Sequence, residues 1–201
     1  MDNENKTTRM EYYLNYDYRW KLLDWIDPNK LSYEGLSSNP KAGVLFKHKN
    51  EISREEWEFL SRNPSASDIL DENYDCYDIN WENLSENPFG IRLLKKFPRF
   101  IDWSCLSSNT SQWAIKLLED NISKVNWKVL SSNPSAIHLL EQNMDKIDWT
   151  ALSSNPSAMH MLEQNQHLID WKILTLNPSA VRLIEQNQDK IDWYYLSLNP
   201  S

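Results

Sequence analysis

The chain has 201 residues, of which 25% are charged and 40% are hydrophobic, and its formal net charge at pH 7 is −8. This balance is ordinary for a folded protein and excludes extensive disorder. The excess of acidic residues argues against nucleic-acid binding unless the basic residues gather on one face. No stretch approaches the length of a membrane-spanning helix, so we expect no membrane partner.

The N-terminal region differs from the rest of the sequence. Residues 1–10 are polar and are predicted to form a flexible tail, without the apolar core of a secretion signal. Residues 11–30 carry many aromatic side chains and are predicted to form a capping helix that covers the first repeat. The two cysteines, Cys76 and Cys105, match no disulfide framework. We therefore expect an intracellular protein.

One phrase recurs from residue 31 to residue 201, with Trp, Leu and Asn-Pro at fixed offsets. Its clearest copies are Trp127–Pro134, Trp149–Pro156 and Trp171–Pro178. Aligned on the Trp, the repeat is 22 or 24 residues long, and Tyr33 takes the place of Trp in the first repeat. A fixed period of this size is typical of a solenoid, in which each repeat packs only on its neighbours. The sequence predicts seven repeats and a final half repeat.

Each repeat is predicted to contain two short helices. In the clearest copy the first helix runs from Trp149 to Ser154, with Asp148 as its N-cap. Ile147 and Leu152 would form a hydrophobic staple around that cap. Such a helix is too short to persist alone in water, so stacking on the next repeat must stabilise it.

The second helix is predicted to begin at Asn155-Pro156. Asn accepts hydrogen bonds from free amides, and Pro at the first helical position lacks the amide that would otherwise go unpaired. Ala158, Met159 and Leu162 would then share the buried face. Asn165 would end the helix, because Asn tolerates the left-handed conformation.

Two sets of residues are predicted to build the repeat frame. Full burial of one Trp, with about 200 Å² of surface, contributes at most about 5 kcal/mol, so we expect Trp149→Ala to unfold the repeats on either side. The predicted core comprises Trp57, Trp81, Trp103, Trp127, Trp149, Trp171, Trp193, Leu130, Leu152 and Leu174. The predicted helix caps are Asn133, Asn155, Asn177, Asp148, Asp170 and Asp192.

No motif for catalysis is present, and we predict no catalytic residue, cofactor or metal. Glycine occurs only at positions 35, 43 and 90, which excludes a glycine-rich phosphate loop. His138 and His160 occupy one position of adjacent repeats, where other repeats have Arg or Lys. We interpret this column as a basic stripe that pairs with Glu residues three positions further on, such as Glu141 and Glu163.

Candidate partner-binding residues lie where the repeat does not fix the residue type. These positions are the two that follow each Trp and the one that precedes each Asn. Variable side chains on a constant frame are typical of solenoid binding surfaces, although drift of an unused surface would give the same pattern. The candidates are Phe59, Asn83, Lys128, Val129, Lys172, Ile173, Tyr194, Tyr195, Leu176 and Leu198.

The phrase Ile-Asp-Trp-x-x-Leu-Ser-x-Asn-Pro-Ser-Ala-Ile-x-Leu-Leu-Glu-x-Asn describes Ile147–Asn165 and Ile169–Asn187 closely. It resembles arrays in proteins of giant amoeba-infecting DNA viruses, the mimivirus-like group. Looser forms cover about residues 31–201, and Leu23–Leu31 resembles the start of such arrays. The resemblance carries no established activity. It implies a viral origin and a setting in the cytoplasm or viral factory of an infected cell.

The sequence as a whole predicts an all-α, right-handed solenoid of two-helix repeats with an N-terminal helical cap. The expected function is non-catalytic recognition of a host or viral protein. One alternative is a helical-repeat reader of nucleic acid, which would need a continuous basic groove. A second alternative is a structural array that self-associates through its C-terminal end, where Tyr194, Tyr195 and Leu198 are predicted to be exposed.

Overall fold

The computed structural model describes residues 26, 27, 30–32, 35, 36, 39–43, 46, 51–73 and 78–199. Every regular element in these residues is a helix, so the all-α prediction is confirmed for them. The chain divides into two compact parts, residues 1–97 and residues 98–201. The predicted tail over 1–10, most of the predicted capping helix over 11–30, and Tyr33 lie outside the described residues.

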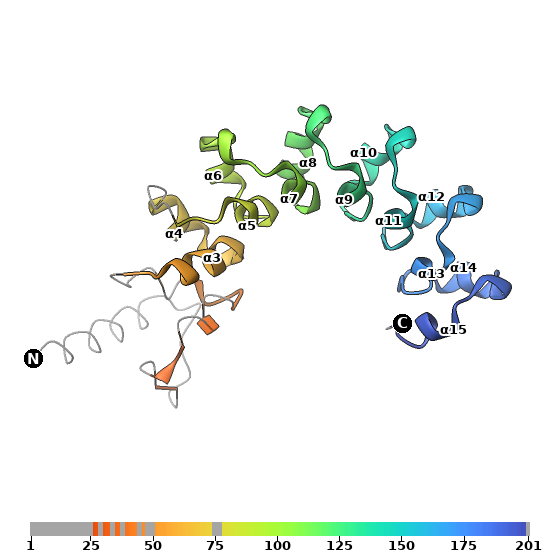
Figure 1. Cartoon of the computed structure of the whole chain (residues 1–201), viewed down its shortest axis with the longest axis horizontal. Helices are drawn as coiled ribbons and strands as arrows, with labels where there is room; N and C mark the ends of the chain where they lie inside the picture. The colour runs from red at the N-terminus through yellow and green to blue at the C-terminus, as the bar shows by residue number, and fades with distance from the viewer. Residues whose placement is uncertain are drawn as a thin grey trace, which may run out of the picture. The chain divides into compact units, whose positions relative to one another are not determined.

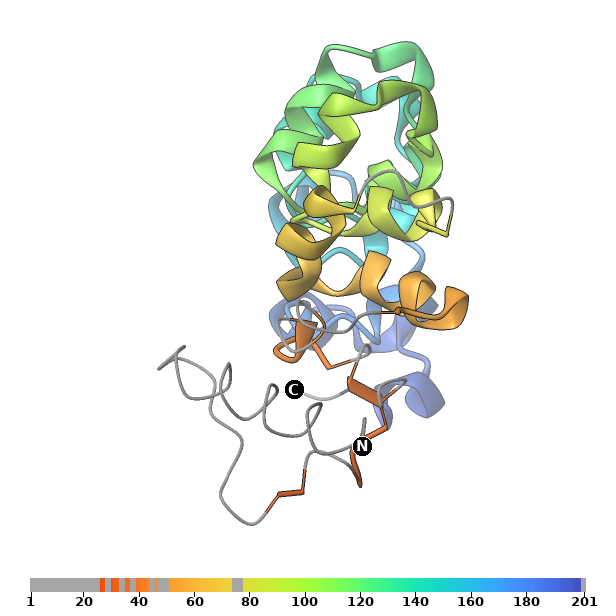
Figure 2. The ribbon, with the colours of Figure 1, turned by 90° about the vertical axis from the view of Figure 1, so that its left-hand side faces the viewer.

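The N-terminal part holds two described helix pairs. Its elements are α3 (Arg54–Arg62), the 3-10 helix η3 (Pro64–Ala66), α4 (Ser67–Glu72), α5 (Trp81–Glu86) and α6 (Ile91–Lys96). Figure 2 turns α3 and α4 toward the viewer. Helix α3 packs on α5, and α4 packs on α6. Each helix therefore contacts its counterpart in the next repeat.

The C-terminal part continues the same order. Its elements are η4 (Pro98–Phe100), α7 (Trp103–Ser108), α8 (Gln112–Glu119), η5 (Ile122–Lys124), α9 (Trp127–Ser131), α10 (Ile137–Glu141), η6 (Met144–Lys146), α11 (Trp149–Ser153), α12 (Met159–Gln164), η7 (Gln166–Leu168), α13 (Trp171–Leu174), α14 (Val181–Glu185), η8 (Gln188–Lys190) and α15 (Trp193–Leu196). Helices α7, α9, α11 and α13 pack on one another in succession. Figure 1 shows them following one another along the inner side of this part of the chain.

A complete repeat in this part has three helical segments rather than the predicted two. Asn165 does not adopt the left-handed conformation, since its φ is −127° and its ψ is 44°. Its side-chain amide donates to the carbonyl oxygen of Met161 at 2.8 Å, and the chain enters η7 directly. The prediction of a left-handed terminator was wrong because a side-chain hydrogen bond and a 3-10 turn end the helix instead.

The first helix of the repeat begins as predicted. Asp148 Oδ1 accepts from the backbone N–H of Ala151 at 2.8 Å, and Asp170 and Asp192 make the equivalent bond. Ile147 and Leu152 are both buried, as a staple requires. The predicted Asp caps are therefore confirmed.

The second helix begins later than predicted, at Met159 rather than at Pro156. Asn155 Oδ1 accepts from the N–H of Ser157 at 3.0 Å, and the Asn155 carbonyl accepts from the N–H of Ala158 at 3.2 Å. The Asn-Pro pair thus forms a separate turn, and the helix starts after it. Met161 is buried beside Ala158 and Leu162, and Met159, which was predicted on this face, is only half-buried.

The predicted core tryptophans differ in their burial. Trp57 is 5% exposed, Trp193 is 68% exposed, and the predicted core tryptophans between them are half-buried. Leu130, Leu152 and Leu174 are fully buried, as predicted. The partly exposed tryptophans each stand at the first position of a helix, whereas Trp57 lies inside α3.

The tryptophan rings instead lie near the repeat surface. A lysine from the next 3-10 helix covers several of them. Lys124 Nζ lies 4.3 Å from the ring centroid of Trp103, and Lys190 Nζ lies 4.4 Å from that of Trp171. Lys146 covers Trp127 in the same way at 5.0 Å. These cation–π contacts join the 3-10 helix at the end of a repeat to the Trp at its beginning and leave each ring partly exposed.

Candidate functional site

The asparagine before each proline joins its repeat to the preceding one. Asn155 Nδ2 donates to the carbonyl oxygens of Ser131 and Asn133, both at 3.0 Å. Asn133 and Asn177 make the same pair of bonds one repeat earlier and one repeat later. We call this series the amide ladder, whose described donors are Asn63, Asn87, Asn133, Asn155, Asn177 and Asn199. The predicted Asn caps therefore have a second role that the sequence analysis missed.

A serine hydroxyl adds a second link between repeats. Ser153 Oγ donates to the carbonyl oxygen of Trp149 at 2.7 Å and accepts from the N–H of Asp170, in the next repeat, at 3.0 Å. Ser131 makes the same two bonds with Trp127 and Asp148. Every buried side-chain nitrogen and oxygen among the described residues has a hydrogen-bond partner. The constant polar residues are therefore used inside the frame.

The residue directly after each Trp, by contrast, varies between repeats and is exposed. In the C-terminal part this position is occupied by Ser104, Lys128, Thr150, Lys172 and Tyr194, all of which are exposed. We call these five side chains the first-turn surface. They stand on the successive helices α7, α9, α11, α13 and α15 and vary in charge, size and polarity. This surface contains the predicted candidates Lys128, Lys172 and Tyr194.

The second residue after each Trp is less available than predicted. Asn83 is buried, accepts from Arg62 Nε at 2.8 Å and donates to the Glu58 carbonyl at 3.2 Å. It is a structural residue, so its prediction as a partner-binding residue is not supported by its position. Val129 and Ile173 are half-buried.

Three candidates meet at the C-terminal end of the first-turn surface. Lys172 Nζ lies 4.7 Å from the ring centroid of Tyr195, and the rings of Tyr194 and Tyr195 meet edge to face at 5.4 Å. The pKa of Lys172 is raised, chiefly by hydrogen bonding to the Tyr195 side chain and also by the carboxylates of Asp192 and Asp170. Lys172 therefore stays charged in this cluster. Tyr194 is exposed and Tyr195 is half-buried.

The remaining candidates lie apart from this cluster. Leu176 is half-buried, and Leu198 is exposed just after α15. Phe59 lies in the N-terminal part, where it lines an open hollow of about 370 Å³ together with Ser53, Glu55, Glu56 and Glu58. The Glu56 carboxylate already accepts from the N–H of Ser53 at 2.9 Å and so serves to cap α3.

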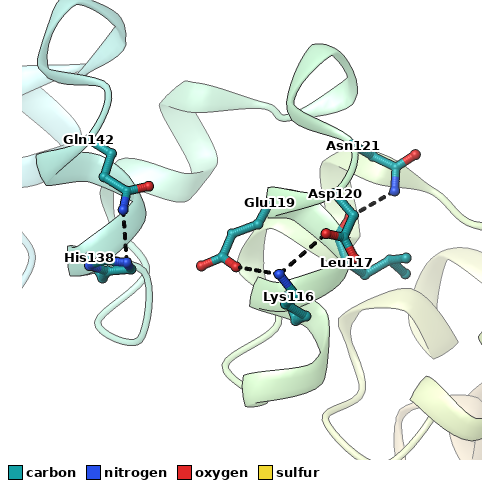
Figure 3. Close-up of polar contacts among 7 residues, drawn as sticks. All are labelled: Lys116, Leu117, Glu119, Asp120, Asn121, His138 and Gln142. Carbon is teal, nitrogen blue, oxygen red and sulfur yellow. Dashed lines mark hydrogen bonds and ion pairs between the residues drawn. The ribbon is translucent and has the colours of Figure 1, made fainter.

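Carboxylates neutralise part of the predicted basic stripe on the second helices. Figure 3 shows Lys116 between two carboxylates at the end of α8, with its Nζ 3.3 Å from both Glu119 and Asp120. These two hydrogen-bonded carboxylates raise the pKa of Lys116. His138 on α10 lies instead beside Gln142, with the two Nε2 atoms 2.9 Å apart.

The pairing of Lys116 with Glu119 follows the predicted spacing of three residues. Other members of the stripe pair across repeats instead. His160 Nε2 lies 2.7 Å from Glu141 Oε1 of the preceding repeat, and Arg92 lies 2.8 Å from Asp71. Such exposed pairs contribute little stability, but they offset the positive charge of this face.

The described residues gather no group of three or more His, Cys, Asp or Glu side chains that could hold a metal ion. None of their helices combines the length and the apolar character needed to cross a membrane.

The fold and surface define an all-α repeat protein whose repeats are joined by buried side-chain amides. Comparison of the chain with protein families, with curated proteins and with solved structures finds no match. Its function must therefore be argued from its own residues.

Proposed function

We propose that this chain is a right-handed α-solenoid that acts as a non-catalytic scaffold and binds a protein partner through its first-turn surface. The observation that carries the proposal is that constant and variable positions of the repeat have different contacts. The constant Asn and Ser residues bond to neighbouring repeats, whereas the exposed residue after each Trp differs from repeat to repeat. Exposed side chains that vary on a constant frame are what a recognition surface requires.

The chemistry of the surface favours a protein over a nucleic acid. Lys124, Lys146 and Lys190 lie over tryptophan rings, and Lys116 is paired with two carboxylates. These cations are not arranged as a continuous groove for phosphates, and the formal net charge of the chain is −8. The lysine and tyrosine cluster around Lys172 instead offers the aromatic and cationic anchors that are common at protein interfaces.

The partner would be a host or viral protein in a cell infected by a giant DNA virus. This part of the proposal rests on the resemblance of Ile147–Asn165 and Ile169–Asn187 to repeats of that viral group. An acidic or apolar partner surface would complement Lys128, Lys172 and Tyr194.

The test is affinity capture from an extract of infected amoebae with three immobilised chains. The first is the parent, and the second carries Lys128→Ser, Lys172→Ser and Tyr194→Ser on the first-turn surface. The third is a matched control with Lys116→Ser and Arg182→Ser on the second helices. We expect the parent and the control to retain the same partner and the first-turn variant to lose it. Equal capture by all three chains would refute the assignment of this surface.

A further inference from the structure

The lysines that cover tryptophan rings occupy one position of the repeat, the last residue of its 3-10 helix. The covered pairs are Trp103 with Lys124, Trp127 with Lys146, and Trp171 with Lys190. In the repeat that begins at Trp149 the same position holds Leu168. A leucine carries no charge, and its side chain ends at Cδ, short of the place where a lysine carries Nζ. Within the part of the chain that the structure describes, no cation lies over the Trp149 ring.

The repeat that begins at Trp171 shows what holds the ammonium group. Lys190 Nζ lies 4.4 Å from the Trp171 ring centroid and donates to Asn187 Oδ1 at 3.0 Å. The Asn187 amide is fixed in this orientation, since its Nδ2 donates to the carbonyl oxygen four residues back at 2.9 Å. The ammonium group is therefore held by the electron-rich face of an indole and by an amide oxygen.

The repeat of Trp149 has the same two acceptors. Asn165 Nδ2 also donates to the carbonyl oxygen four residues back, at 2.8 Å. The backbone of Asn165, with φ −127° and ψ 44°, is close to that of Asn187, with φ −134° and ψ 48°. Trp149 is half-buried and stands first in its helix, as Trp171 does. The ring and the amide oxygen are thus arranged as they are around Lys190, but Leu168 brings no ammonium group to them.

We propose that a lysine side chain of the protein partner binds here, with its ammonium group over the Trp149 ring and hydrogen-bonded to Asn165 Oδ1. The chemistry of this group is argued from the neighbouring repeats, in which the same frame holds a lysine of the chain itself. Leu168 is 39% exposed and offers an apolar surface to the aliphatic stem of the incoming lysine. Lys124 and Lys146 occupy consecutive repeats, so the frame accommodates cations in adjacent repeats.

The assignment of the lysine to a protein partner rests on the proposed function. Trp149 directly precedes Thr150, the middle member of the first-turn surface, so the lysine would enter beside that surface on α11. The ammonium site itself is a property of this chain. It can therefore be tested without the partner, and its failure can be told apart from failure of the proposed function.

The first experiment titrates the chain with n-butylammonium chloride, which has the stem and the charge of a lysine side chain. Indole N–H resonances are followed by nuclear magnetic resonance from about 1 mM to about 200 mM, a range that detects weak binding. The control is n-butanol with an equal concentration of sodium chloride. We expect butylammonium, but not butanol, to shift the Trp149 resonance further than those of Trp127 and Trp171. No shift at Trp149, equal shifts at the three rings, or equal shifts with butanol would overturn the proposal.

Two substitutions of one residue then test the geometry. Leu168→Lys supplies the ammonium group from within the chain, and Leu168→Met is the matched control, which is long and flexible but uncharged. Leu168 is exposed, so both variants should fold, and circular dichroism checks this. We expect only Leu168→Lys to abolish the butylammonium shift at Trp149, with a melting temperature about 1–4 °C above that of Leu168→Met. A titration that Leu168→Lys leaves unchanged would show that the ring and the amide form no ammonium site.

Capture from infected-cell extract tests the occupant. We expect Leu168→Lys to retain at least tenfold less partner than the parent and Leu168→Met to retain as much as the parent. If the first-turn variant loses the partner and Leu168→Lys keeps it, the proposed function stands and no partner lysine binds at Trp149. If even the parent captures no protein, the proposed function fails, and a partner's lysine as the occupant fails with it. The butylammonium titration then still decides whether the ammonium site exists.

Discussion

Replacing Asn155 with Asp tests the amide ladder inside the array. The substitution preserves the shape of the side chain and the oxygen that accepts from Ser157. It removes the Nδ2 group that makes both hydrogen bonds and places an oxygen within about 3 Å of the carbonyl oxygens of Ser131 and Asn133. Each lost hydrogen bond costs about 1 kcal/mol, and each buried carbonyl left unpaired costs about 1–3 kcal/mol. With partial relaxation the free energy of unfolding should fall by about 3–5 kcal/mol, a large fraction of the total for a domain.

Asn165→Asp is the matched control, since Asn165 is half-buried and donates only within its own repeat, to Met161 at 2.8 Å. Its loss should cost about 1 kcal/mol. Urea unfolding followed by circular dichroism measures both variants, with the midpoint compared because repeat arrays can unfold in steps. If Asn155→Asp lowers the midpoint no more than Asn165→Asp does, the ladder is not a main source of stability.

Three smaller effects follow from the same contacts. Ser153→Ala should lower the free energy of unfolding by about 1–2 kcal/mol, because the Ser153 hydroxyl links two repeats. Ser154→Ala is the control and should cost less than about 0.5 kcal/mol, because this side chain is exposed. Equal melting temperatures of the two variants would contradict the prediction. In thermal unfolding, Trp57→Ala should lower the free energy of unfolding by about 3–5 kcal/mol, because Trp57 is buried. Trp193→Ala should lower it by less than about 0.5 kcal/mol, because Trp193 is exposed. The reverse order would contradict the burial of these two residues. Lys190→Met should cost about 0.5–1 kcal/mol and change the fluorescence of the ring it covers, and an unchanged spectrum would argue against the cation–π contact.

Much of the repeat frame could be predicted from spacing alone. The period predicts the first helices, and the Asp before Trp149, Trp171 and Trp193 predicts their caps because a carboxylate at that position satisfies free amides. Burial of Leu152 and Ala158 followed from helical periodicity. These features depend on local geometry, which the sequence encodes within one repeat.

The amide ladder depends on the distance between repeats, which no single repeat reveals. One signal pointed to it. The cap before Trp is Asn in some repeats and Asp in others, as at Asn126 and Asp148, but the position of Asn155 is Asn in every repeat, even where Thr110 replaces the following Pro. A cap needs only an acceptor, so the strict choice of Asn indicates that its amide donors are also used, as they are at Asn155. The exposure of the tryptophans escaped prediction because the covering lysine lies at the other end of the repeat, in its 3-10 helix.

The central claim is that the protein partner binds the first-turn surface and does not contact the second helices. Hydrogen exchange of the chain, measured by mass spectrometry with and without its captured partner, tests this directly. The account predicts new protection in the first helices α9, α11 and α13, over residues 127–131, 149–153 and 171–174. Protection confined to α10, α12 and α14, over residues 137–141, 159–164 and 181–185, would contradict it.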